Sequence, residues 1–346
     1  MKFSRAVIAS IGYELPPRVV SSRALEEQLA PLYRDLRLQP GQLQALTGIR
    51  ERRFWDDGQT MADGAAQAGR KALAASGVDP ADIGLLIYGG VCRDHLEPAT
   101  ACEVAHGLGL GAPAQVYDVS NACLGVLNGI VNIAQAVELG HVRAGLAVSC
   151  ESARPIVELT IRQLLERREM ELLRVSLATL TGGSGAVGVV VCDQGAAPGG
   201  HRLLGGVARN NTRHHRLCRW GSDGGTLVDA PTKLVTDASA VLEHGVQLGV
   251  ETWRAFLAEL GWTAESIDRT VCHQVGAPHR EAIMKAIGFP KEKDFVTYEF
   301  LGNVGTVSLP ITAAIAEERG FLERGHRVGM LGIASGLNCL MLGVEW

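Results

Sequence analysis

The sequence predicts an α/β protein made of two duplicated halves, and three observations support that prediction. Glycine is frequent, at 42 of 346 residues, while aromatic residues make up only 5%, a composition typical of tight turns and close backbone approaches. Short runs such as LLIYGG and GLAVS are apolar throughout, as in strands covered by helices on both faces. Segments of the first half also recur in the second half at a nearly constant spacing, which indicates an internal repeat.

The repeat contains helices and strands in the same order. Residues 70–77 (RKALAASG) correspond to residues 254–261 (RAFLAELG), and both expected helices end in glycine, which favours helix termination. The same offset aligns Ile83 with Ile267 in the strands that follow. A Gly-His pair precedes an apolar strand in each half, at 140–141 and at 325–326. We therefore expect an N-terminal half over about 1–190 and a C-terminal half over 200–346.

One segment, residues 152–180, has no counterpart in the second half. Its apolar residues recur at helical spacing (IVELTIRQLLERREMELLRVSLATL), which predicts an amphipathic helical insertion. Two interpretations remain open at this point: a helical addition on the surface, or a wall of a substrate channel.

Composition and charge exclude several classes of function. The formal net charge is −4, without a basic excess, which argues against a nucleic-acid-binding protein. Eight cysteines without a CxxC pair exclude zinc-ribbon and thioredoxin-like sites and suit a reducing cytoplasm. No signal peptide is expected, because the first residues, MKFSRAVIASIGYELP, hold only one short apolar run. No transmembrane segment is expected either, because the longest uncharged stretch, 119–137, is rich in Asn, Gln and Gly. We expect no metal and no bound cofactor, since the sequence has no P-loop, HExxH or EF-hand pattern.

A candidate nucleophile lies where an expected strand leads into a helix. Residues 115–125 read QVYDVSNACLG, which places Cys123 at the start of a long apolar helix. A helix N-terminus favours a thiolate through its dipole and its free N–H groups. The alternative is that Cys123 is a packing residue like most buried cysteines.

Two partners for Cys123 come from the second half. His273 follows an expected strand, where the functional groups of α/β proteins collect. Asn303 lies in the glycine-flanked turn LGNVG, which opens the helix equivalent to the one after Cys123. A Cys, a His and an Asn together can form a thioester and polarise its carbonyl group. His273 could instead be a core histidine, and Asn303 an ordinary turn residue.

The three motifs NACLG, CHQ and GNVGT resemble those of the thiolase superfamily, specifically its ketoacyl-ACP-synthase-III-like condensing enzymes, over essentially the whole chain. The resemblance implies the thiolase fold, five αβαβα layers built from two duplicated halves, and a homodimer. It also implies an oxyanion hole made by the backbone N–H of Cys123 and the turn at Ser335 and Gly336.

Departures from the synthase III pattern narrow the resemblance. The string after His273 reads QVG where those enzymes have QAN, and LTGGSG at 180–185 replaces FGDGAG. Glu97 precedes Cys123 by 26 residues in the segment CRDHLEPAT; this feature resembles the OleA family, in which the glutamate comes from the neighbouring subunit. Without the resemblance, Glu97 reads as a solvated loop carboxylate beside Arg93.

The resemblance to the OleA family implies an acyltransferase that joins two long-chain fatty acyl-CoAs without decarboxylation. Joining unactivated acyl groups requires removal of an α-proton, so a carboxylate base is useful. The expected product is a 2-alkyl-3-oxo fatty acid, and downstream enzymes of olefin biosynthesis are expected as possible partners. Three alternatives are a decarboxylative 3-oxoacyl-ACP synthase III that uses malonyl-ACP, a hydroxymethylglutaryl-CoA-synthase-like enzyme, and an inactive scaffold subunit.

Overall fold

The protein is described from a computed structural model, in which residues 1–221 and 233–346 are placed. Ten strands form one mixed sheet in the order β12-β11-β13-β14-β8-β1-β7-β6-β4-β5. The strands of the first half are β1 (Ala6–Glu14), β4 (Ile83–Tyr88), β5 (Gln115–Asp118), β6 (Ala144–Glu151) and β7 (Gly185–Asp193). Those of the second half are β8 (His201–Asn210), β11 (Arg269–Cys272), β12 (Asp294–Phe295), β13 (Arg327–Ala334) and β14 (Asn338–Glu345).

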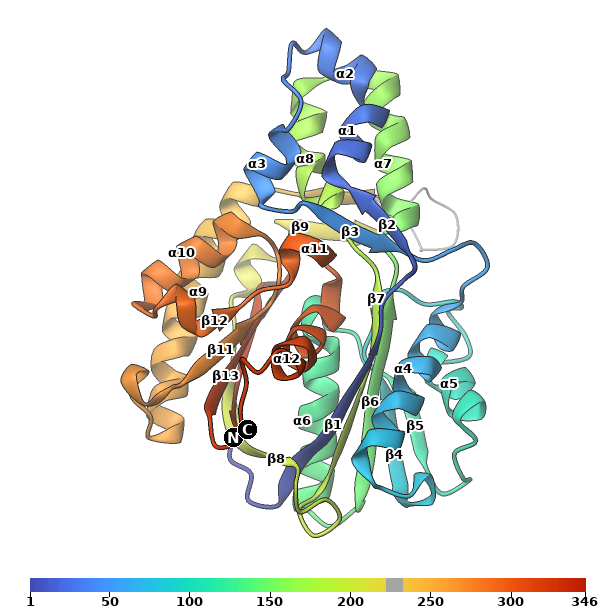
Figure 1. Ribbon diagram of the computed structural model, residues 1–346, viewed down its shortest axis with the longest axis vertical. Coiled ribbons are helices and arrows are strands. Elements are labelled where there is room, and N and C mark those ends of the chain that lie inside the picture. Colours follow the sequence, from blue (N-terminus) through green and yellow to red (C-terminus); the bar gives the residue numbers. More distant parts are fainter. Residues whose placement is uncertain (222–232) are drawn as a thin grey trace.

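The two halves of the sheet repeat the same order of strands. From the middle outward, the first half runs β1-β7-β6-β4-β5 and the second runs β8-β14-β13-β11-β12. The halves meet where β1 pairs with β8 at Val7–Arg202 and Ile8–His201, and the pairing continues before β1 through a bridge between Lys2 and Gly205. The two halves of the sheet lie as separate layers (Figure 1).

Helices complete the five layers. The helices α6 (Gly125–Glu138) and α12 (Ser308–Glu318) lie between the two half-sheets (Figure 1), where their apolar side chains form the largest core cluster. The helices α4 (Met61–Ser76) and α5 (Thr100–Leu108) cover the outer face of the first half. The helices α9 (Ala238–Leu260) and α10 (Ala277–Ile287) cover the outer face of the second. The αβαβα thiolase architecture expected from the sequence is therefore present.

A helical cap stands at one end of the layers (Figure 1). It contains α1 (Ser22–Gln28), α2 (Ala30–Asp35), α3 (Gln42–Thr47), α7 (Arg154–Arg167) and α8 (Met170–Leu180), with the two-stranded antiparallel sheet of β2 (Arg18–Ser21) and β3 (Glu51–Phe54) beneath. The cap has its own apolar core. The expected insertion is thus helical, but it is broken into two helices at Arg168, whose φ is 52°.

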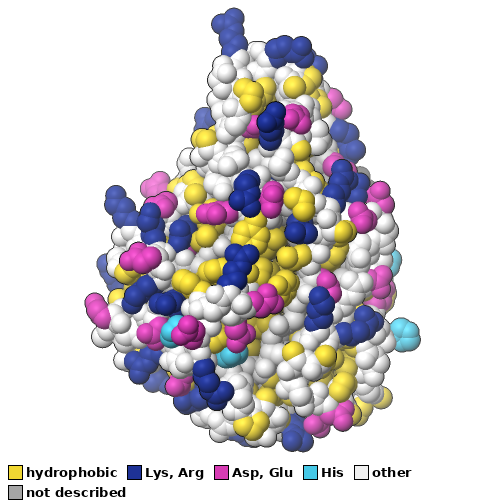
Figure 2. Space-filling view, viewed as in Figure 1, with side chains coloured by type: hydrophobic (Ala, Val, Ile, Leu, Met, Phe, Trp, Pro, Cys, Tyr) yellow, Lys and Arg dark blue, Asp and Glu magenta, His cyan; other side chains and the backbone are white. Residues whose placement is uncertain are grey.

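The surface carries charges of both signs. Basic and acidic side chains are interspersed over the face shown in Figure 2, in line with the small net charge. Among the described residues, every helix is too short or too polar to cross a membrane.

Candidate active site

The nucleophile segment makes a tight elbow between β5 and α6. Ala122 has a φ of 45°, a left-handed conformation that is costly for a residue with a Cβ atom and is concentrated at functional sites. Cys123 follows in one turn of 3-10 helix, Ala122–Leu124, before α6 begins at Gly125. A Cβ atom at Gly125 would collide with the backbone of Gly89, so glycine lets the helix end lie against the end of β4.

The second half supplies the two predicted partners of Cys123. His273 directly follows β11, and its backbone N–H donates to Leu331 O at 2.9 Å. Asn303 is held by its backbone N–H, which donates to Thr181 O at 2.9 Å. The Asn303 Oδ1 accepts the Gly305 N–H at 3.0 Å. The Asn303 amide is therefore oriented with Nδ2 left to donate to another group.

One hydrogen bond joins the two helix starts that carry these residues. The Val126 N–H at the start of α6 donates to Thr306 Oγ1, just before α12, at 2.8 Å. The twofold relation between the halves therefore brings the nucleophile turn and the Asn303 turn together, as the repeat predicts.

A cavity of about 420 Å³ contains all three residues. Its polar lining includes Cys123, His273, Asn303 and Ser335. The lining is largely apolar and comes from the cap, α9 and the second half-sheet, with Ala178 and Thr179 of α8, Val241, Leu242, Gly245 and Gly249 of α9, and Leu331, Ile333 and Met341 of β13 and β14. Of the two interpretations of the insertion, the channel wall therefore applies to the start of α7, through Ile156, and to the end of α8.

The predicted oxyanion turn is connected to the nucleophile segment. Ser335 and Gly336 join β13 to β14, and Gly336 has a φ of 132°, a conformation that favours glycine. Asn338 Nδ2 donates to Ser335 O at 3.3 Å and to Asn121 Oδ1 at 3.1 Å. Since Asn121 lies two residues before Cys123, this amide fixes the turn relative to the nucleophile.

The electrostatics of the site differ from the sequence-based expectation. Burial raises the pKa of the Cys123 thiol to about 12, and the nearby Cys218 and Glu151 add to the rise. The prediction that the helix start favours a thiolate is therefore wrong for the unliganded site, because desolvation outweighs the helix end. Burial also lowers the pKa of His273 to about 4. The resting site thus holds a thiol and a neutral imidazole.

Glu97 does not line the cavity of its own chain. Its side chain is exposed, in the loop between β4 and α5, next to Leu96, which is 67% exposed. The loop is anchored on both sides of this tip: Asp94 accepts two backbone N–H groups at the start of α4, and Asp118 accepts two at the start of α5. Glu97 is therefore held outward on a fixed loop.

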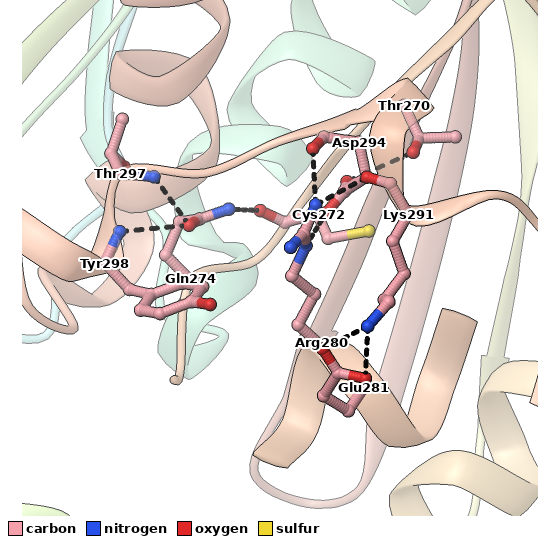
Figure 3. A network of polar contacts seen from close by, with 9 residues as sticks. All are labelled: Thr270, Cys272, Gln274, Arg280, Glu281, Lys291, Asp294, Thr297 and Tyr298. Carbon is pink, nitrogen blue, oxygen red and sulfur yellow. Dashed lines mark hydrogen bonds and ion pairs between the residues drawn. The ribbon is translucent and has the colours of Figure 1, made fainter. Parts of the chain in front are cut away.

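A polar network fixes the strand end that carries His273 (Figure 3). Gln274 donates to Cys272 O at 2.7 Å and accepts the backbone N–H groups of Thr297 and Tyr298 at 2.9 and 3.2 Å. It thereby joins the end of β11 to α11 (Tyr298–Leu301), which leads directly into the Asn303 turn.

Beside Gln274, a buried ion pair joins α10 to β12. Arg280 Nε donates to Asp294 Oδ2 at 2.9 Å, and the Asp294 side chain is fully buried. Thr270 Oγ1 of β11 donates to the other carboxylate oxygen at 3.1 Å (Figure 3).

The sequence did not single out Cys218, His279 or Arg280, which also line the cavity. For the segment that ends in Glu151, the sequence left open a place in the channel or ordinary packing, and Glu151 lines the cavity. Glu151 is only 5% exposed, like the packed residues Ser149 and Cys150 before it. Burial lowers the pKa of His279 to about 4. A carboxylate at the end of a largely apolar strand, AGLAVSCE, was the available signal for Glu151.

Comparisons with known families agree with this geometry. Residues 56–177 match the thiolase N-terminal domain, and residues 257–346 match the C-terminal domain of 3-oxoacyl-[acyl-carrier-protein] synthase III. The two matches fall on the segments that supply Cys123 and those that supply His273 and Asn303.

Individual relatives narrow the assignment. The chain is 51% identical to an acyl-CoA:acyl-CoA alkyltransferase of Shewanella oneidensis, covering 100% of both chains. It matches crystal structures of Xanthomonas campestris OleA at 36% identity with a TM-score of 0.94, covering 100% of this chain and 98% of that one. A β-ketoacyl-[acyl-carrier-protein] synthase III of Rhodobacter capsulatus is more distant, at 28% identity over 99% of both chains. The chain therefore belongs to the acyl-CoA:acyl-CoA alkyltransferase family of thiolase-fold condensing enzymes.

Proposed function

We propose that this protein condenses two long-chain fatty acyl-CoAs head to head, without decarboxylation, through an acyl-Cys123 intermediate. The observation that carries the proposal is the lining of the site: one cavity includes Cys123, His273 and Asn303 and is otherwise largely apolar. Such a space suits an alkyl chain attached to a reacting thioester. The related OleA has been crystallised with lauric acid and lauroyl-CoA.

The first step transfers one acyl group to Cys123. Because the resting pair is neutral, the thiol must lose its proton as it attacks the thioester carbonyl, and the nearby neutral His273 is the acceptor. The proton then passes to the departing CoA thiolate. Acyl-Cys123 and one CoA thiol result.

The second step forms the carbon–carbon bond. The carbonyl oxygen of a second acyl-CoA accepts hydrogen bonds from Asn303 Nδ2 and His273, which stabilise negative charge on that oxygen. A base removes the α-proton, and the enolate carbon attacks the acyl-Cys123 carbonyl. The backbone N–H of Cys123 and the Ser335–Gly336 turn stabilise the tetrahedral oxyanion, which collapses to release the Cys123 sulfur. Hydrolysis of the remaining CoA thioester gives a 2-alkyl-3-oxo fatty acid and a second CoA.

Glu97 of the partner subunit is the proposed base. A carboxylate held outward on an anchored loop cannot serve the cavity of its own chain, but it suits a neighbouring one. The exposed edge strand β5, with Tyr117 36% exposed, lies beside the loop and supports a homodimer interface there. Among the variants of Xanthomonas campestris OleA that have been crystallised, a substituted glutamate precedes a substituted cysteine by the same interval as Glu97 precedes Cys123.

The proposed setting is the cytoplasm, in a pathway that consumes the condensation product. All eight cysteines are free thiols, which suits a reducing compartment. The product is a β-keto acid, so a reductase of olefin biosynthesis is the proposed class of enzyme acting next.

The test gives the purified protein a single fourteen-carbon acyl-CoA and no malonyl donor. We expect CoA release, together with a doubled-chain β-keto acid or the ketone formed by its decarboxylation, detected by mass spectrometry. The Cys123→Ala variant should form neither acyl-enzyme nor product. Turnover only after addition of malonyl-ACP would instead identify a decarboxylative synthase III.

A further inference from the structure

Glu151 is a buried carboxyl group that the proposed mechanism does not use. It ends β6, is 5% exposed, and lines the same cavity as Cys123. A buried carboxyl group in a largely apolar cavity is costly unless its oxygens are well bonded, so its partners indicate its role.

On one side, Glu151 holds the turn from which the Glu97 loop starts. Its Oε1 accepts the Val91 N–H at 2.9 Å, and its Oε2 accepts the Cys92 N–H at 3.2 Å. Each carboxylate oxygen thus has one backbone donor. Because both donors lie at the start of the loop, the carboxylate fixes the direction in which the loop leaves the sheet.

On its other side, Glu151 packs against the turn that orients Asn303. A Cβ atom added at Gly305 would lie 3.4 Å from Glu151 Cγ and 3.5 Å from Cδ, so the carboxyl group and this glycine are close neighbours. The Gly305 N–H is the group that fixes the Asn303 amide. A shift of Glu151 would therefore displace both the Asn303 turn and the start of the Glu97 loop.

We infer that Glu151 is a positioning residue for condensation, which sets the Asn303 turn of its own site and the loop that carries Glu97 in register with each other. The inference rests on the proposed function, since it assumes that Glu97 and Asn303 act on the second acyl-CoA. Loss of the carboxylate should then impair carbon–carbon bond formation and spare the first acyl transfer.

The charge of Glu151 allows a second measurement, the reactivity of the Cys123 thiol. The ionisable groups that interact with it are Tyr88 of β4, Cys92 and Arg93 of the loop, Cys150 of β6, and Cys123. Burial raises the pKa of Glu151, while the two N–H donors and Arg93 favour the charged form. Ionised Glu151 raises the pKa of the Cys123 thiol, so its neutralisation should make Cys123 easier to alkylate.

The experiment compares Glu151→Gln with Glu26→Gln in the full-length protein. Glu26 is a matched control: it is also 5% exposed and accepts two backbone N–H groups, those of Gly41 and Leu43, but it lies in the cap. For Glu151→Gln we expect acyl-enzyme formation within about twofold of wild type and a fall in the kcat of condensation of at least about tenfold. We also expect faster alkylation of Cys123 by iodoacetamide. Glu151→Asp, which keeps the charge, should recover part of the condensation rate.

Two outcomes would overturn the inference. One is wild-type condensation by Glu151→Gln. The other is a result in which Glu151→Gln and Glu26→Gln both lose acylation and condensation to the same extent, and neither changes the rate of Cys123 alkylation. That result would assign Glu151 to fold stability alone. Failure of the proposed function can be distinguished from failure of this inference, because the wild-type protein itself would then make no doubled-chain product from acyl-CoA.

Discussion

At the scale of single residues, the positions of the proposed catalytic groups could be predicted, but their ionisation could not. Cys123, His273 and Asn303 each follow a recognisable local signal: a strand-to-helix elbow, a strand end and a glycine-flanked turn. The pKa of Cys123 depends instead on burial by parts of the chain far away in the sequence, such as the strand that carries Cys218. An argument from the local helix start alone therefore predicts a lowered pKa for the Cys123 thiol, whereas the pKa is raised.

The neutral resting state predicts how Cys123 responds to pH. Because burial raises its thiol pKa to about 12, the thiolate fraction of the unliganded enzyme should keep rising throughout the accessible range. Alkylation by iodoacetamide, followed by intact mass at Cys123, should accelerate roughly tenfold per pH unit between pH 7 and 10. A plateau near pH 7 would contradict this account and indicate a thiolate–imidazolium pair.

At the scale of elements, the helices and strands could be predicted from the apolar pattern and the repeat, whereas the hydrogen bonds that connect them could not. The repeat identified the equivalent helices α4 and α9 and the strands β4 and β11. Gln274 could be read only as part of the CHQ motif, and its bonds to Thr297 and Tyr298 appear only when α11 is brought beside the end of β11. For Glu151 the sequence left two interpretations open, a place in the channel or ordinary packing, because its hydrogen bonds reach a loop sixty residues earlier.

The buried ion pair between α10 and β12 predicts a difference in stability between two substitutions. Asp294→Asn leaves Arg280 without its counter-charge and should lower the free energy of unfolding by about 3 kcal/mol, because a broken buried pair leaves a charge uncompensated. Glu281→Gln removes the exposed pair between Glu281 and Lys291 and should cost about 0.5 kcal/mol. Urea unfolding of both variants measures this; equal losses would show that Asp294 is not needed to compensate the Arg280 charge.

At the scale of the whole molecule, the duplication explains how distant segments form one site. Each half delivers a helix start to the interface between the half-sheets: the first carries Cys123 and the second follows Asn303. The cap adds the wall at the end of α8, which has no equivalent in the repeat. The sequence could therefore predict the layers and the polar groups of the cavity, but not its apolar lining, which depends on packing between the cap and α9.

The central claim is that each site combines Cys123 of one subunit with Glu97 of its partner. The most direct measurement co-expresses Cys123→Ala and Glu97→Gln chains with different tags, purifies the mixed dimer and assays it with a single acyl-CoA. In that dimer one site has both groups and the other has neither, so we predict about half the activity of the wild-type dimer, while each variant alone is inactive. An inactive mixed dimer, or full activity of the Glu97→Gln protein by itself, would contradict the account.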